Sequence, residues 1–299
     1  MRGIWTALVT PFNDKNELDL PSFKKILRDQ VEAGVAGVIP CGSTGESPTL
    51  SLAEKKTLIQ VALEELKGTS VRVAAGTGTA NTADTLEFSR WASDQGVEAV
   101  LLVTPYYNRP SQAGLEAHFK SVADAVTCEV ILYNVPGRTG VSLTPQTIVQ
   151  LASHPRIRTL KEATGNTAFA SEILDQLVSK KLSMDILSGD DATALPLYSI
   201  GAVGAISVAS NLFPRAMVAI LKAAESGQFE QAMHLHKKFY PLFRDLFIES
   251  NPVPIKSAMS TVGFCQSRVR LPLAPLTAGN AEKLNTSLAH CGLKQGRRA

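Results

Sequence analysis

Residues 99–135 read AVLLVTPYYNRPSQAGLEAHFKSVADAVTCEVILYNV. Two β-rich apolar runs, Ala99–Thr104 and Val130–Val135, flank a segment with helical spacing, Ser111–Val126. Strands that are apolar throughout are typical of a parallel sheet that is covered on both faces. The stretch therefore predicts one β–α–β repeat of an α/β protein.

The same alternation runs through most of the chain. Further β-rich runs are Ile4–Val9, Val35–Pro40, Val71–Ala75, Arg158–Ala163, Met184–Ser188 and Gly204–Ala209. Further segments with helical spacing are Leu20–Gly34, Ser51–Leu66, Thr82–Gln95, Thr144–Leu151 and Ala168–Val178. About eight strands in this length fit either an open doubly wound sheet or a closed barrel. Because no glycine-rich nucleotide turn follows the first strand, we predict a (β/α)8 TIM barrel.

The last part of the chain has helical segments without strands. These segments are Phe213–Ser226, Phe229–Ile248, Val253–Gly263 and Ala281–Cys291. We therefore predict two parts: residues 1–211 form the barrel core, whose final helix runs to about residue 226, and residues 227–299 form a small C-terminal helical extension.

Composition excludes several classes of protein. The net charge of the 299 residues is +3, and three positive residues, Lys294, Arg297 and Arg298, belong to a basic tail that we expect to be frayed. The remaining chain is close to neutral, which argues against nucleic-acid binding. No apolar run approaches the about 18 residues of a membrane helix, and the N-terminus lacks the pattern of a signal peptide. Four widely spaced cysteines fit a reduced, cytoplasmic protein.

Candidate catalytic residues follow the strands, because the active sites of barrels form at the carboxyl ends of the strands. Lys161 interrupts the predicted strand Arg158–Ala163, whose alternate positions should include the barrel interior. Burial favours the neutral form of an amine, and a neutral amine attacks carbonyl groups to give a Schiff base. The alternative is a lysine that reaches solvent or pairs with Glu162.

Hydroxyl groups and one arginine follow neighbouring strands. Tyr133 and Tyr107 are candidate proton-transfer groups, and Ser43 or Thr44 could link them. The alternative for the tyrosines is packing at the edge of the core. Arg138 follows a Pro-Gly turn and suits a bidentate grip on a carboxylate, although a surface ion pair would also explain it.

Metal chemistry has weak support. Asp190 and Asp191 are adjacent acids without further ligands nearby, which make a poor magnesium site. His234 and His236 lie in a predicted helix, where residues two apart do not face each other. We therefore expect no metal.

The motifs together resemble the dihydrodipicolinate synthase family, within the pyruvate-dependent Schiff-base aldolases. The matching stretches run from Gly3 to about Leu293 and are Gly42–Glu46, Pro105–Pro110, Tyr133–Gly140, Lys161–Asn166, Ser188–Asp191 and Asn251–Lys256. The resemblance implies a lyase that condenses pyruvate with L-aspartate-4-semialdehyde to 4-hydroxy-tetrahydrodipicolinate, for diaminopimelate and lysine biosynthesis. It implies no cofactor, because Lys161 itself forms the Schiff base with pyruvate.

The resemblance also implies roles for individual residues. Tyr133 and Tyr107 would flank Ser43 in a proton relay, with Tyr107 supplied by a neighbouring subunit of a homotetramer built from two tight dimers. Substrate binding would fall to four residues: Thr44 on the pyruvate carboxylate, Arg138 on the semialdehyde carboxylate, and the backbones of Gly189 and Ile206 along the pocket.

Two departures from the family are visible. Most synthases have threonine where this chain has Ser43, so the hydroxyl is kept but the methyl that restricts its rotation is lost. Members that lysine inhibits carry polar residues at the positions of Leu52, Lys55, Ala80 and Asp84. We therefore expect weak or absent inhibition by lysine.

Two other functions compete with this interpretation. A sugar-acid aldolase of the N-acetylneuraminate or 2-keto-3-deoxygluconate type shares the lysine and tyrosine strands, but a polyol substrate does not require Arg138. A non-catalytic pyruvate-binding scaffold would not need Lys161, Tyr133, Tyr107 and Ser43 together.

Overall fold

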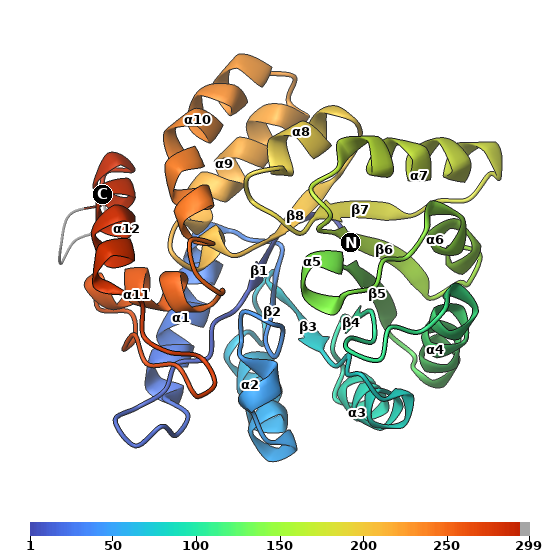
Figure 1. Ribbon diagram of the computed structural model, residues 1–299, viewed down its shortest axis with the longest axis horizontal. Coiled ribbons are helices and arrows are strands. Elements are labelled where there is room, and N and C mark those ends of the chain that lie inside the picture. Colours follow the sequence, from blue (N-terminus) through green and yellow to red (C-terminus); the bar gives the residue numbers. More distant parts are fainter. Residues whose placement is uncertain (294–299) are drawn as a thin grey trace. The chain divides into compact units, whose positions relative to one another are not determined.

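The computed structural model describes residues 1–293 and contains a closed barrel of parallel strands in the order β1 to β8 (Figure 1). The strands are β1 (Gly3–Ala7), β2 (Gly37–Ile39), β3 (Arg72–Gly76), β4 (Ala99–Val103), β5 (Glu129–Asn134), β6 (Ile157–Glu162), β7 (Asp185–Ser188) and β8 (Gly204–Ser207). The predicted (β/α)8 TIM barrel is confirmed. Each predicted β-rich run contains most of one observed strand.

Helices follow the strands and also form the C-terminal part. They are α1 (Leu20–Ala33), α2 (Leu52–Glu65), α3 (Thr82–Asp94), α4 (Gln112–Ala125), α5 (Pro136–Thr139), α6 (Pro145–Leu151), α7 (Thr167–Ser179), α8 (Ala194–Ser199), α9 (Pro214–Glu225), α10 (Phe229–Asp245), α11 (Val253–Thr261) and α12 (Ala278–His290). Two 3-10 turns, Ser47–Thr49 and Ala209–Asn211, complete the set. Capping explains several of the boundaries: the Ser51 side chain and Glu54 form a reciprocal capping box at the start of α2.

By its internal contacts the chain divides into two compact units. The first consists of Met1–Gly3 and Val73–Ile206. Within it, β4 to β7 pair in parallel, and α3, α4, α6 and α7 cover their outer side (Figure 1). The core of this unit is aliphatic: Val130, Ile131 and Leu132 of β5 are fully buried.

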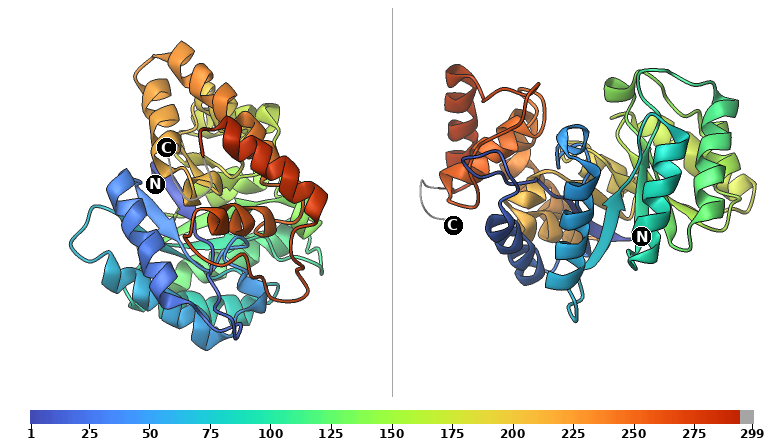
Figure 2. Two further views of the ribbon diagram at one scale, coloured as in Figure 1. Left: turned by 90° about the vertical axis from the view of Figure 1, so that its left-hand side faces the viewer. Right: turned by 90° about the horizontal axis from the view of Figure 1, so that it is seen from below.

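The second unit consists of Ile4–Arg72 and the described residues from Ser207 onward. Within it, β1 pairs with β2, α10 contacts α9 and α12, and α11 contacts α12, as Figures 1 and 2 show. The predicted helical extension is therefore present as helices. The compact units divide the chain at other positions and so do not test the boundary predicted near residues 211–226, which stays a prediction.

The short helices α5 and α8 were not expected as helices. A helix of four to six residues contains too few turns to show an apolar period, so the sequence pattern does not reveal it. In α5, Pro136 at the first position favours the helical backbone, and Gly140 ends the turn at φ +72°. Among residues 1–293, no helix combines the length and apolarity needed to cross a bilayer. The basic tail with Lys294, Arg297 and Arg298 lies outside the described residues.

Candidate active site

Lys161 lies near the carboxyl end of β6 and is only 4% exposed. It is in register with Tyr133 of the neighbouring strand β5, which is 6% exposed. The Lys161 Nζ lies 4.0 Å from the centroid of the Tyr133 ring. A primary amine and a phenol are thus held together inside the first unit, at the end of the strands where barrel enzymes place their chemistry.

Glu162 does not neutralise Lys161 at the strand end, as the alternative interpretation would require. Successive residues of a strand point to opposite faces, and Glu162 is itself buried. Its Oε1 accepts hydrogen bonds from the backbone N–H and the hydroxyl of Thr164. Burial raises the pKa of Glu162, and these hydrogen bonds oppose the shift. The carboxyl group therefore fixes the turn after β6.

Gly189 packs directly against the lysine. Its N–H donates to the Glu162 carbonyl at 2.6 Å. A Cβ atom at this position would lie 2.7 Å from the Cβ of Ala163 and 3.1 Å from the Cε of Lys161. Glycine is thus required sterically, and the structure brings the predicted residue Gly189 to Lys161. Ile206, the other predicted lining residue, is fully buried in β8.

Tyr107 is placed differently from Tyr133. It is 94% exposed and adopts a left-handed backbone, with φ +72°. The loop is fastened at its base, where the Tyr107 N–H donates to the Thr139 carbonyl at 3.4 Å and the Asn108 side chain donates to the Ala80 carbonyl at 3.1 Å. A left-handed tyrosine is strained, and such strain is common at functional loops. The structure does not bury Tyr107 with Lys161.

Arg138 lies in the short helix α5 and is exposed. Its backbone N–H donates to the Val135 carbonyl at 2.9 Å, so the turn after β5 fixes the start of the side chain. Thr139 next to it is buried, and its hydroxyl accepts from Thr104 at 3.2 Å. The loops after β4 and β5 are therefore joined beneath Arg138.

The second unit carries the hydroxyl residues of the loop after β2. Thr44 is 2% exposed, and its Oγ1 accepts a hydrogen bond from the Asn251 side chain at 2.8 Å. Ser43 is half-buried. The Thr10 hydroxyl donates to the Gly45 carbonyl at 2.7 Å and ties the loop to the end of β1. This loop is thus held from both sides.

A buried ion pair fastens α11 to the same loop. The Lys256 Nζ lies 2.6 Å from Glu46 Oε1 and 2.8 Å from the Thr10 carbonyl, and both charged side chains are fully buried. Burial lowers the pKa of Lys256, and the Glu46 carboxylate opposes the shift. Glu46 also has φ +55°, a conformation that the ion pair helps to hold.

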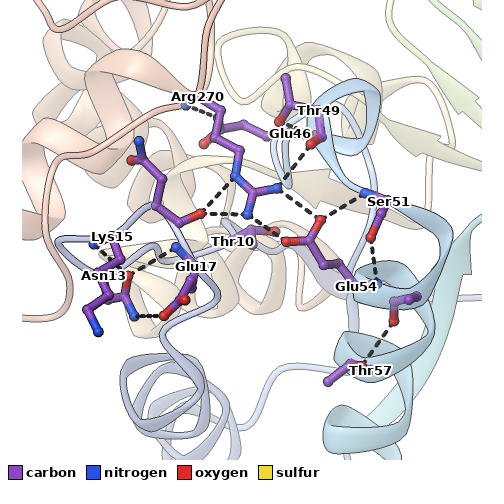
Figure 3. Close-up of polar contacts among 12 residues, drawn as sticks. Thr10, Asn13, Lys15, Glu17, Glu46, Thr49, Ser51, Glu54, Thr57 and Arg270 are labelled. Carbon is purple, nitrogen blue, oxygen red and sulfur yellow. Dashed lines mark hydrogen bonds and ion pairs between the residues drawn. The ribbon is translucent and has the colours of Figure 1, made fainter.

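Arg270 completes this connection (Figure 3). Its backbone N–H donates to Glu46 Oε2 at 3.0 Å. Its guanidinium forms an ion pair with Glu54 at 2.5 Å and donates a hydrogen bond to the Asn16 carbonyl at 2.6 Å. The guanidinium lowers the pKa of Glu54 to about 2. The C-terminal segment therefore clamps both the loop after β2 and the start of α2.

Sequence reasoning gave no role to Asn251, Glu46 and Lys256. All three lie in stretches that matched the family, but their partners are up to 210 residues away in sequence. Spacing cannot reveal such contacts. A polar or charged residue inside an otherwise apolar segment, as with Lys256 in α11, is the signal that was available.

A closed barrel with a buried lysine at the end of its sixth strand, beside a buried tyrosine, defines a class of enzyme, the lyases of the class I aldolase type. The model of the dihydrodipicolinate synthetase family matches residues 1–291. The chain belongs to this family.

Relatives and solved structures agree with this assignment. The 4-hydroxy-tetrahydrodipicolinate synthase of Leptospira biflexa is 44% identical over 94% of each chain. That of Methanosarcina mazei is 44% identical over 98% of this chain and 99% of the relative. The structure of the synthase from Methylacidiphilum fumariolicum covers 98% of this chain and 96% of its own, with a TM-score of 0.94 and 42% identity. The Aquifex aeolicus structure has a TM-score of 0.95, with 38% identity over 99% of this chain and 100% of its own.

Proposed function

We propose that this protein condenses pyruvate with L-aspartate-4-semialdehyde to give 4-hydroxy-tetrahydrodipicolinate. The observation that carries the proposal is Lys161, buried at the end of β6 with its amine against Tyr133. Family membership over nearly the whole chain supplies the substrates, because the relatives are named for this product. The proposal requires no metal and no organic cofactor, since the lysine amine performs the carbonyl chemistry.

The reaction begins on the Lys161 amine. Its nitrogen attacks the keto carbon of pyruvate, and loss of water gives an imine. Removal of a methyl proton then gives an enamine, whose carbon attacks the aldehyde of the semialdehyde, and the resulting alkoxide takes up a proton. The amino group of the adduct attacks the imine carbon, closes a six-membered ring and releases Lys161 as the free amine.

Proton transfers are assigned to hydroxyl groups. Tyr133 adjoins Lys161, and we propose that it exchanges protons with Ser43 and Tyr107. We assign Thr44 to the pyruvate carboxylate, Arg138 to the semialdehyde carboxylate, and the backbones of Gly189 and Ile206 to the pocket wall. Arg138 is suited to this role because an arginine on a short, fixed turn can grip a carboxylate with two parallel hydrogen bonds.

The assembly belongs to the proposal as well. An exposed tyrosine on a fastened loop is available to a second copy of the chain, and we assign Tyr107 to the active site of the neighbouring subunit. The proposed assembly is a homotetramer of two tight dimers. We place this enzyme in the cytoplasm, where its four cysteines, all free, would stay reduced.

Borohydride trapping with pyruvate tests the central residue. We expect a stable adduct on Lys161 in the wild-type protein and none in Lys161→Ala, with equal melting temperatures of the two folded proteins. Arg138→Ala should still form the adduct and should raise the KM for the semialdehyde. An adduct that persists in Lys161→Ala would contradict the assignment, and loss of the adduct in Arg138→Ala would contradict the role of Arg138.

Inhibition by lysine is expected to be weak or absent. Leu52 offers no side-chain hydrogen bond and Lys55 adds a positive charge, at two positions where the resemblance implies polar residues in members that lysine inhibits. The measurement is initial rate against lysine concentration at saturating pyruvate. Half-inhibition by submillimolar lysine would show that the expectation is wrong.

A further inference from the structure

The contact between Asn251 and Thr44 joins two segments that are 207 residues apart. Asn251 lies two residues before the start of α11, and Thr44 lies in the loop after β2. The amide Nδ2 of Asn251 donates to the Thr44 Oγ1 at 2.8 Å, and the two residues are 4% and 2% exposed. A hydrogen bond this well shielded from water restricts the orientation of both side chains.

The direction of this bond sets what the threonine can do next. A hydroxyl group has one hydrogen to donate and two lone pairs that accept. Because the Thr44 oxygen already accepts from the Asn251 amide, its own hydrogen is not used in that contact. The hydroxyl is therefore kept as a donor for another acceptor, and a donor is what a carboxylate requires.

We propose that Asn251 is a positioning residue that holds the Thr44 hydroxyl as a hydrogen-bond donor to the carboxylate of the bound keto acid. This rests on the proposed function, in which Thr44 binds the pyruvate carboxylate. Asn251 acts through Thr44 and needs no contact with substrate.

The contacts that hold the segment around Asn251 support this role. Five residues after Asn251, the Lys256 amine lies 2.6 Å from Glu46 Oε1, and Glu46 is two residues after Thr44. Lys256 also donates to the Thr10 carbonyl, and the Thr10 hydroxyl donates to Gly45. The start of α11 and the Thr44 loop are thus tied at two further points. This rigidity keeps the amide at hydrogen-bond distance from the hydroxyl.

Asn251→Asp is the most informative single change, because it keeps the shape and exchanges the donor for an acceptor. The Thr44 hydroxyl would then donate to the new carboxylate instead of to substrate. We expect the pyruvate concentration that half-saturates borohydride trapping on Lys161 to rise about tenfold or more. The rate constant for turnover at saturating pyruvate should change much less, since the chemistry on Lys161 is not altered.

A double-mutant cycle separates this role from a general structural one. Thr44→Val, Asn251→Ala and the double variant are compared for half-saturating pyruvate in trapping. We expect Asn251→Ala to raise the half-saturating pyruvate concentration about three- to tenfold in the wild-type background. In the Thr44→Val background it should raise that concentration hardly at all. Glu54→Gln is the matched control, because it removes the charge that pairs with the Arg270 guanidinium at the start of α2 but leaves the Arg270 N–H on Glu46 and the contact between Asn251 and Thr44, so pyruvate binding should be unchanged.

The outcomes distinguish the two levels of the proposal. Equal effects of Asn251→Ala in both backgrounds, or a fall in turnover without any change in half-saturation, would overturn the role of Asn251 alone. A wild-type protein that forms no adduct with pyruvate would overturn the proposed function and this inference with it. If Asn251→Ala does not fold, Asn251→Ser, whose hydroxyl is too short to reach Thr44, takes its place in the cycle, and the same criteria apply.

Discussion

The proposed chemistry depends on how single residues are packed around Lys161. The amine is buried against the Tyr133 ring, and the Cε faces Gly189, which leaves no space for a side chain. A side chain confined on two sides keeps few rotamers, so the amine is held in place before substrate arrives. Lys161 was a candidate because a lysine at a buried position of a barrel strand is an exception to the pattern, whereas the role of Gly189 in the pocket came from the family resemblance.

Gly189→Ala tests this packing. The new methyl would lie 2.7 Å from the Cβ of Ala163, which must move, and 3.1 Å from the Cε of Lys161, which must give way by a few tenths of an ångström. Misplacing a reacting group by about 1 Å can cost about a hundredfold in rate. For the smaller displacement expected here, we expect a fall of about tenfold in the rate of pyruvate adduct formation, measured by borohydride trapping, with the barrel still folded.

Gly279→Ala in α12 is the control, because a Cβ there meets no atom within 4 Å. It should trap pyruvate at the wild-type rate. Wild-type trapping by Gly189→Ala would show that the contact with Lys161 does not restrict the amine.

At the level of elements, the C-terminal segment holds the loop that carries Ser43 and Thr44. Lys256 pairs with the buried Glu46 of this loop, and the backbone N–H of Arg270 donates to the same carboxylate; both residues lie more than 200 positions later in the sequence. The periodicity of the sequence predicted the helices on both sides of these contacts. It could not predict the contacts themselves, because they depend on tertiary packing rather than on local pattern.

The same comparison explains which elements were missed. The long helices α1 to α4, α7 and α9 to α12 were predicted because an apolar stripe repeats over several turns. The short helices α5 and α8 show no such stripe, although α5 carries Arg138. The exposure of Tyr107 was equally invisible, since its sequence neighbours do not reveal on which side of a loop the ring lies.

The ion pair between Glu54 and Arg270 makes stability depend on pH. The pKa of Glu54 falls from 4.5 to about 2, so the native state stabilises the carboxylate. That stabilisation is fully present above pH 4.5 and is lost as the pH falls toward 2. Because the pair is partly exposed, we expect Glu54→Gln to lower the free energy of unfolding by about 1 kcal/mol at neutral pH.

Urea denaturation of both proteins, from neutral pH down to about pH 3, measures this difference. The gap between wild type and Glu54→Gln should narrow as the pH falls below 4.5. A gap that stays constant across this range would mean that the guanidinium does not stabilise the charged carboxylate.

At the scale of the whole molecule, the proposed oligomer matters because it would supply Tyr107 to the active site of the neighbouring subunit. Tyr107 is almost fully exposed although it lies in a stretch that matches the family. A second copy of the chain that covers Tyr107 would explain why this residue is both strained and exposed in the single chain.

Mixing two inactive variants tests whether Tyr107 acts across subunits. Tyr107→Phe and Lys161→Ala are each expected to lose at least about a hundredfold in turnover. In co-expressed mixed dimers, one site would contain an intact lysine from one subunit and an intact tyrosine from the other. Activity should therefore recover to about a quarter of the wild-type value at equal amounts. Mixed oligomers that stay inactive would place Tyr107 in the site of its own chain.

The most direct test of the proposed function is a comparison of aldehyde acceptors with pyruvate as the common donor. Turnover is measured with L-aspartate-4-semialdehyde, N-acetylmannosamine and glyceraldehyde under the same conditions. We predict a kcat/KM for the semialdehyde at least about a hundredfold above the others, because the proposed role of Arg138 is to bind a carboxylate that the sugar aldehydes lack. Preference for a sugar aldehyde would contradict the proposal: Lys161 and the barrel would keep their roles, and the enzyme would be a sugar-acid aldolase.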